Sequence, residues 1–107
     1  MEVKKQLEKQ IINLLQLGWR SRIIKIGFDD TLKELKAGKK GFLILARDIS
    51  KRTKRNILYK YDGEYFELFS KEDLGRFLGK KEVGIVFIPD TKFGRKIKEK
   101  ITKYSLI

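Results

Sequence analysis

The sequence has 107 residues, enough for one domain with a modest core. Lys and Arg number 26 against 14 Asp and Glu, a net charge of +12, and there is no cysteine or histidine. Their absence excludes disulfides and thiolate chemistry, and removes the commonest general base and zinc ligand. No apolar run approaches the roughly 18 residues of a membrane span. We expect a single domain over 1–107, cytoplasmic and non-enzymatic, without cofactor or metal.

The excess positive charge favours a polyanionic partner: RNA, DNA or an anionic membrane surface. Residues 61–90 carry 4 basic and 7 acidic side chains, whereas the flanking segments are basic, so a one-sided basic face is expected. The alternative is the Lys-rich surface of a thermophile without such a partner, and the scarcity of Asn, Gln and Met fits a hot-growing source. Because thermophile surfaces usually balance Lys with Glu, we favour nucleic-acid binding.

Apolar residues recur at helical spacing over 3–17, and the β-branched run 22–26 predicts a strand that ends at Gly27. Asp29 is expected to cap a helix that reaches Ala37. The continuous apolar run 41–46 is typical of a central strand that is buried on both faces.

Ser50 is expected to cap the next helix, whose inner side chains are Thr53, Ile57 and Tyr61. A third strand follows over 64–69. The remaining predicted elements are a helix from the Ser70 cap to Gly79, a second apolar strand over 83–88 that closes at Pro89, and a helix over 91–104 that Asp90 can cap.

The order αβαβαβαβα predicts an α/β fold with a sheet between layers of helices. Strands 41–46 and 83–88 are expected at its centre. Ligands of such sheets bind where loops leave the strands and meet helix N-termini. The predicted binding region therefore consists of the loops 27–30, 47–50 and 88–92.

Each candidate residue has a structural alternative. The turn from Gly27 to Lys33 can offer backbone N–H groups to RNA, or it can be a plain helix cap made by Asp29 and Asp30. The cations of 51–55 can contact phosphates or form a solvated face. Asp48 is expected to hold its loop by accepting backbone N–H bonds, rather than to act in catalysis or metal binding.

The loop 88–92 offers Lys92, and Arg95 beyond it, to phosphates, and an exposed Ile88 to an unstacked base. A simple strand-to-helix cap is the alternative here. Trp19 and Tyr65 are expected in the core rather than as stacking platforms.

Three blocks together resemble the ribosomal protein L7Ae family. The segment 45–57 (LARDISKRTKRNI) resembles its "LA-x-D-x-S-x-x-T-x-x-x-I" block, and 70–80 (SKEDLGRFLGK) resembles "S-K-E-E-L-G-R-A-x-G". The segment 26–33 (IGFDDTLK) lies where the family has "G-x-N-E-x-x-K". Order and spacing agree over about residues 12–102, and 90–94 (DTKFG) resembles the bacterial YlxQ-type branch.

The resemblance implies a three-layer α/β/α sandwich with a mixed four-stranded sheet. It also implies binding to kink-turn RNA, a sharply bent helix with sheared G·A pairs, in a ribosomal or translation-associated role. Residues that the loops and the resemblance together assign to RNA are Gly27, Phe28, Asp29, Asp30, Lys33, Arg47, Lys51, Lys54, Lys71, Ile88, Pro89, Asp90 and Lys92.

Two positions depart from the family pattern, because Asp29 replaces its Asn and Asp30 its Glu. Asp30 can still accept from guanine N–H groups, but Asp29 cannot donate to guanine O6 and brings a negative charge near phosphates. An altered RNA target is therefore one hypothesis. The alternative is a protein-interaction adaptor of the translation machinery that kept the fold and lost kink-turn specificity.

Overall fold

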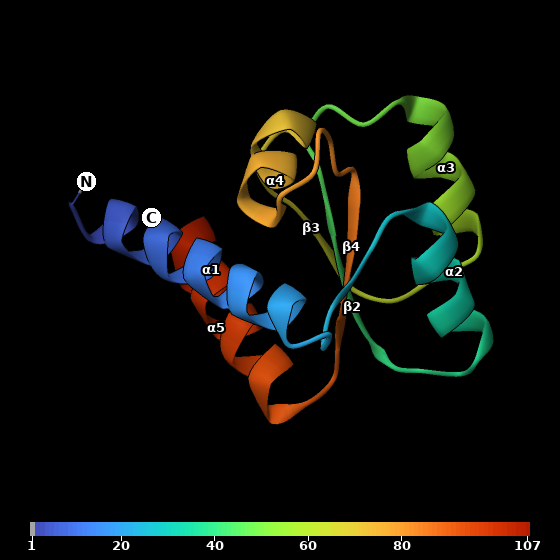
Figure 1. The fold of residues 1–107 in the computed structure, drawn as a ribbon, viewed down its shortest axis with the longest axis horizontal. Helices are drawn as coiled ribbons and strands as arrows, with labels where there is room; N and C mark the ends of the chain where they lie inside the picture. The colour runs from blue at the N-terminus through green and yellow to red at the C-terminus, as the bar shows by residue number, and fades with distance from the viewer. Residues whose placement is uncertain (1) are drawn as a thin grey trace.

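The computed structural model describes residues 2–107 as a four-stranded sheet between two layers of helices (Figure 1). In chain order the elements are α1 Glu2–Arg20, β1 Lys25–Ile26, α2 Phe28–Lys36, β2 Gly41–Leu45, α3 Lys51–Tyr59, β3 Tyr65–Glu67, α4 Lys71–Leu78, β4 Ile85–Pro89 and α5 Lys92–Ser105. Helices α1, α4 and α5 cover one face of the sheet, and α2 and α3 cover the other (Figure 1). The predicted α/β/α sandwich is confirmed.

The sheet is mixed, with the strand order β1-β4-β2-β3. Strand β2 runs parallel to β3, whereas β4 is antiparallel to both of its neighbours. Strands β2 and β4 are central, as predicted. Strands β1, β2 and β3 therefore end at one edge of the sheet, which we call the carboxyl edge, and β4 ends at the opposite edge, the amino edge.

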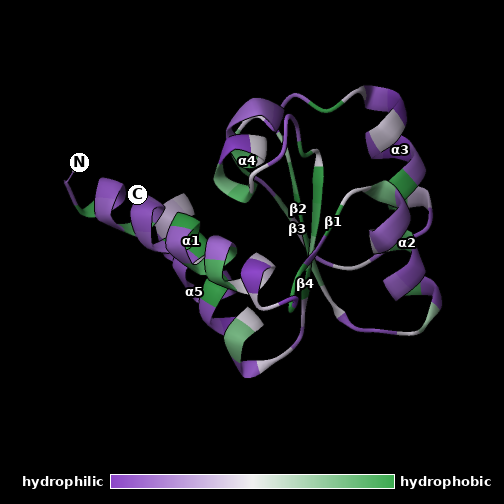
Figure 2. Ribbon diagram, in the orientation of Figure 1, coloured by the Kyte–Doolittle hydropathy of each residue, from purple (hydrophilic) through white to green (hydrophobic). Residues whose placement is uncertain are grey.

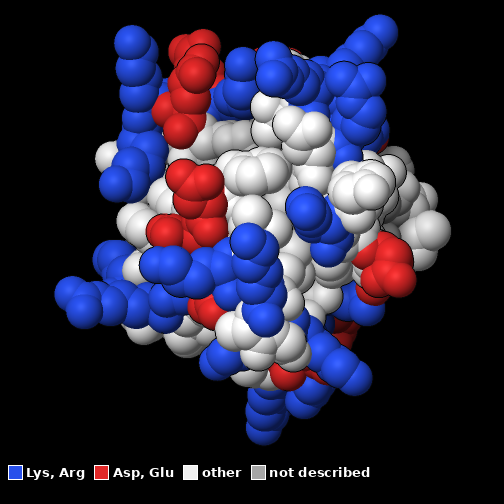
Figure 3. All heavy atoms as spheres, turned by 90° about the vertical axis from the view of Figure 1, so that its right-hand side faces the viewer, with Lys and Arg blue, Asp and Glu red and all other residues white. Residues whose placement is uncertain are grey.

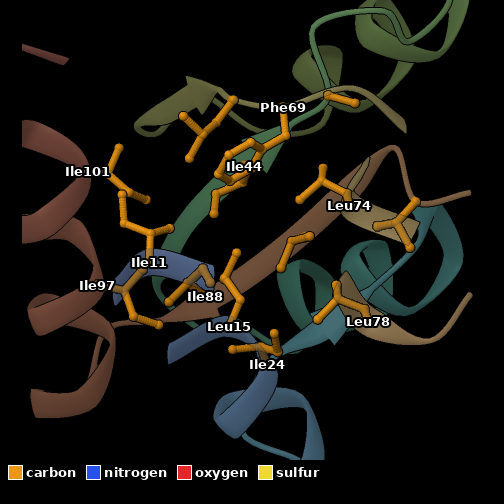
Figure 4. Close-up of a cluster of buried hydrophobic side chains, with 14 of the residues drawn as sticks. Ile11, Leu15, Ile24, Ile44, Phe69, Leu74, Leu78, Ile88, Ile97 and Ile101 are labelled. Atoms are coloured by element: carbon orange, nitrogen blue, oxygen red, sulfur yellow. The ribbon is translucent and has the colours of Figure 1, made fainter. Parts of the chain in front are cut away.

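Side chains of the central strands alternate between two hydrophobic clusters, because successive residues of a strand point to opposite faces. The larger cluster lies against α1, α4 and α5 and includes Ile11, Ile44 and Ile88 (Figure 4). The smaller one, against α2 and α3, includes Leu43 and Phe87. The strands are accordingly hydrophobic and the outer helix surfaces largely hydrophilic (Figure 2). No helix within residues 2–107 is both long and apolar enough to cross a membrane.

Two predicted strands are shorter than expected. The segment 22–26 begins with Arg22 at a φ of 60°, and the N–H groups of Ile23 and Ile24 donate to the Gly18 carbonyl. These residues close the end of α1, so β1 keeps two residues. The predicted strand 64–69 keeps three, and Phe69 turns away at a φ of 64°.

Helix caps agree with the sequence at two of four predicted places. The hydroxyls of Ser50 and Ser70 accept from the third residue of their helices, as predicted. The prediction that Asp90 caps the last helix is wrong, because Thr91 caps it by accepting from the Gly94 N–H. The predicted Asp29 cap is also wrong, because Gly27 precedes α2 and no side chain caps that helix.

Tyr61 lies beyond the end of α3, where the sequence placed it on the inner face of that helix. Its hydroxyl donates to the carbonyls of Gly41, at 3.1 Å, and Glu64, and its ring packs against the smaller cluster. Burial, followed by the charges of Glu64 and Asp62, raises its pKa to about 12. Tyr61 therefore fastens the segment after α3 to the start of β2.

Replacing Tyr61 by phenylalanine is expected to lower the free energy of unfolding by about 1 kcal/mol at pH 8, because two carbonyls lose a donor. The raised pKa means that the folded state holds this proton more tightly than the unfolded state. The stabilisation is present below pH 10 and is lost as the pH rises toward about 12. Urea unfolding of both proteins at pH 8 and pH 11 measures it. If the difference in unfolding free energy between the wild-type protein and Tyr61→Phe is as large at pH 11 as at pH 8, the stabilising role of the Tyr61 hydroxyl proton is contradicted.

Candidate nucleic-acid interface

Backbone hydrogen bonds join four chain segments at the carboxyl edge of the sheet. The Gly27 N–H, before α2, donates to the Ile85 carbonyl at 2.8 Å. The Ala46 N–H, after β2, donates to Gly84 at 2.9 Å, and the Val83 N–H donates to Lys71 at 3.0 Å. The turn before α2, the loop after β2, the start of α4 and the loop before β4 therefore form one surface.

Asp48 fixes the loop after β2 to the start of α4. Its Oδ1 accepts a 2.8 Å hydrogen bond from the Lys71 N–H, which confirms the predicted role of Asp48 as a loop-holding acceptor. Ile49 next to it faces Gly84, where a Cβ atom would lie 2.9 Å from the Ile49 Cγ2. The loop after β2 and the loop before β4 are therefore in direct contact.

The first turn of α2 is open to solvent. Gly27 has a φ of 94° and a ψ of 163°, a conformation that is essentially restricted to glycine. Asp29 and Asp30 are exposed, and within residues 2–107 their carboxylates take part in no hydrogen bond or ion pair. Lys33, one turn further, is also exposed. The uncapped amides of this turn, with the positive end of the helix dipole, suit an anion or a hydrogen-bond acceptor.

Lysines of the carboxyl edge supply positive charge. Among the described residues, Lys33, Lys51, Lys71 and Lys81 form no ion pair. Lys54 differs, because its Nζ lies 3.1 Å from Glu67 Oε2, and this hydrogen bond raises the pKa of Lys54. These unpaired lysines have charge free for phosphates.

The loop from Ile88 to Lys92 is not part of this surface, and its predicted place there is wrong. Pro89 pairs with Gly41, so the loop leaves the sheet at the amino edge. Ile88 is 0 % exposed and cannot pack on an unstacked base. Asp90 is held at the amino edge, where its carboxylate pairs with Arg95 at 3.1 Å. The physical reason is that β4 runs antiparallel to its neighbours.

The loop 79–84 occupies the place that the sequence assigned to 88–92. It leaves α4 at Gly79, whose φ is 72°, and carries Lys80, Lys81 and Glu82 into β4. The pair of lysines after a helix-ending glycine was the signal available in the sequence. These lysines could be assigned to the carboxyl edge only once the direction of β4 was known. Because β4 is antiparallel to β1 and β2, the loop that enters β4 lies where β1 and β2 end.

Arg47 lies in the loop after β2, at the carboxyl edge, whereas the two predicted core aromatics lie elsewhere. Arg47 is exposed, and its backbone N–H donates to the Phe69 carbonyl at 2.8 Å. Burial and the hydrogen bond from its hydroxyl to Glu8 raise the pKa of Tyr104 on α5. Trp19 packs against the larger cluster, as predicted, with Lys80 Nζ 5.6 Å from the centre of its ring. Tyr65 is 37 % exposed, so its predicted core position is wrong.

The structure is thus a mixed α/β/α sandwich that carries unpaired lysines at the carboxyl edge of its sheet. The sequence model of the family described as ribosomal protein L7Ae/L30e/S12e/Gadd45 matches residues 9–98. The chain belongs to this family.

Similar proteins agree in sequence and in fold. An RNA-binding protein YlxQ from Enterococcus faecium is 32% identical over 98 residues, which cover 87% of this chain and 92% of that protein. A solved protein of unknown function from Bacillus halodurans superposes with a TM-score of 0.76 at 28% identity, over 86% of this chain and 96% of its own. The 15.5 kD RNA binding protein of Giardia lamblia, 22% identical, shares the fold with a TM-score of 0.67, over 94% and 89% of the two chains.

Proposed function

We propose that the protein is a non-enzymatic, cytoplasmic RNA-binding protein that recognises a kink-turn or a similarly bent RNA, in a ribosomal or translation-associated setting. Membership of the L7Ae family and the similarity to an RNA-binding protein YlxQ support RNA as the partner. The observation that carries the proposal is the joining of the uncapped start of α2 to three other segments at the carboxyl edge.

Each element of this edge has a part in the proposed contact. The first turn of α2 enters the RNA groove, where Gly27 allows a close approach of the backbone. Lys33, Lys51 and Lys71 meet phosphates on either side of the bend. The loop 79–84 lies beside this turn and is the second segment that faces the RNA.

A gel-shift titration against a kink-turn RNA, and against a twin whose G·A pairs are replaced, tests the proposal at two salt concentrations. We expect binding to the kink-turn RNA to be the tighter of the two and to weaken with salt, because neutralised phosphates release counterions. Equal binding to both RNAs would contradict the proposed specificity for kink-turn RNA and leave a general RNA-binding protein. Absence of binding to either would overturn the RNA function and favour the protein adaptor.

Replacing Asp29 by asparagine is expected to tighten RNA binding about fivefold at low salt. Two unit charges about 4 Å apart in water interact by about 1 kcal/mol, and the substitution removes a repulsion of that order. The introduced side-chain amide could also donate to guanine O6. The matched control is Asp62→Asn, the same change of charge at an exposed position before β3. An equal gain in both variants would assign the effect to net charge alone.

A further inference from the structure

A groove of about 360 Å³ lies between α2 and α3, on the outer side of the molecule. Its lining consists of Phe28, Leu32, Arg55, Asn56, Tyr59 and Lys60. Figure 3 turns this side of the molecule toward the viewer and shows an uncharged region bordered by many Lys and Arg side chains and, at its left and right, by some acidic side chains. The lining holds two cations and no carboxylate.

The charge of this groove distinguishes it from the larger cleft of about 580 Å³ at the amino edge. That cleft is lined by Glu64, Asp90 and Glu99 as well as by cations, and each of these acids is already in an ion pair with a neighbouring Lys or Arg. The amino-edge cleft is therefore close to neutral. The groove between α2 and α3 combines an apolar floor with unopposed positive charge, which suits an anionic partner that has a flat apolar part.

Tyr59 is the most exposed aromatic side chain of this groove. It is the last residue of α3, its exposed fraction is 84 %, and Lys60 Nζ lies 5.7 Å from the centre of its ring. Exposed aromatic rings beside cations are the platforms on which nucleic-acid bases stack. Asn56 lies three residues earlier on the same helical face, and its amide can both donate to and accept from the edge of a base.

The groove is continuous with the carboxyl edge through Phe28. This residue opens α2 directly after Gly27, and it also lines the groove. An RNA strand that leaves the first turn of α2, past Asp29 and Asp30, can therefore enter the groove, whose own lining holds no acidic side chain.

We propose that the groove between α2 and α3 binds an unpaired nucleotide next to the bent RNA element. The base stacks on Tyr59 above Phe28 and Leu32, Asn56 reads its edge, and Arg55 and Lys60 hold the adjoining phosphates. This inference rests on the proposed RNA function and extends the contact beyond the carboxyl edge. Positive charge without any carboxylate in the lining favours a nucleotide over a protein segment.

The test compares a blunt kink-turn RNA with one that carries a four-nucleotide unpaired extension. The extension contains 2-aminopurine at one position at a time, since its fluorescence falls on stacking. We expect the extension to tighten binding about tenfold and the fluorescence of 2-aminopurine to be quenched at one position.

The variant Tyr59→Ala is expected to remove the tighter binding and the quenching and to leave the affinity for the blunt RNA unchanged, whereas Tyr59→Phe keeps both effects. Tyr65→Ala, at an exposed tyrosine of β3, serves as the control and keeps both.

The outcomes separate this inference from the proposed function. Tight binding of the blunt RNA, with no gain and no quenching from the extension, would overturn the groove site and leave the RNA function standing. A gain that persists in Tyr59→Ala would also overturn it and would leave the groove open to a protein. Failure to bind either RNA would overturn both proposals.

Discussion

Replacing Gly94 by alanine is expected to lower the free energy of unfolding by at least about 2 kcal/mol. Gly94 lies in the first turn of α5 against the end of β4, and an added Cβ would overlap the Pro89 carbonyl oxygen and approach Ile88 Cγ2 to 3.2 Å. Overpacking costs typically about 1–3 kcal/mol, and here the obstacle is backbone that cannot change rotamer. Alanine's better helix propensity, about 1 kcal/mol, offsets only part of the cost.

Urea unfolding followed by circular dichroism measures the effect of Gly94→Ala. Lys96→Ala is the matched control, because Lys96 is exposed on the same helix and its replacement is expected to change stability by less than about 0.5 kcal/mol. An unfolding free energy of Gly94→Ala equal to that of the control would mean that α5 can move away from β4 at no cost.

Replacing Gly27 by alanine is expected to weaken RNA binding about tenfold, and to cost about 1–3 kcal/mol of stability through backbone strain. Nothing in the protein lies within 4 Å of the position of an added Cβ at Gly27. The added methyl group would therefore project from the surface and obstruct the close approach of the RNA to the backbone. The gel shift with the kink-turn RNA, at a temperature where the variant is folded, measures the loss.

Gly38 is the matched control for Gly27. It also has a positive φ, 78°, with open space around an added Cβ, but it lies after α2, at the other end of the helix. Gly38→Ala is expected to lower stability and to leave RNA affinity unchanged. A similar loss of affinity in both variants would show that the RNA responds to stability and not to contact at Gly27.

Features encoded in a few neighbouring residues were predictable from the sequence. Ser50 and Ser70 cap their helices because a hydroxyl reaches the N–H three residues on, which is a purely local interaction. Strands β2 and β4 are central because both are apolar on both faces. Asp48 accepts a backbone N–H from 23 residues away, and the sequence predicted this type of bond but not its partner.

The direction of β4 was not predictable from local pattern. An apolar run such as Ile85–Pro89 has the same composition in either direction, and its pairing with β1 and β2 depends on contacts far apart in the chain. Because β4 is antiparallel, its last residues and the loop after it lie at the amino edge, away from the candidate site; these are Ile88, Pro89, Asp90 and Lys92. The loop 79–84, which precedes β4, lies at the candidate site for the same reason. Long-range topology therefore decided which lysines face the proposed RNA.

The pairing of α1 with α5 bears on the order in which a growing chain acquires its structure. The Tyr104 hydroxyl donates to Glu8 Oε2 at 2.9 Å across 96 positions of sequence, and Phe93 meets Gly18 near the other end of the two helices. During synthesis α1 is made first, and the part of its apolar stripe that faces α5 stays uncovered until residues 92–105 have left the ribosome. Closure of this layer is therefore a late step of folding, and a chain that lacks α5 leaves the side of α1 that faces α5 exposed to solvent.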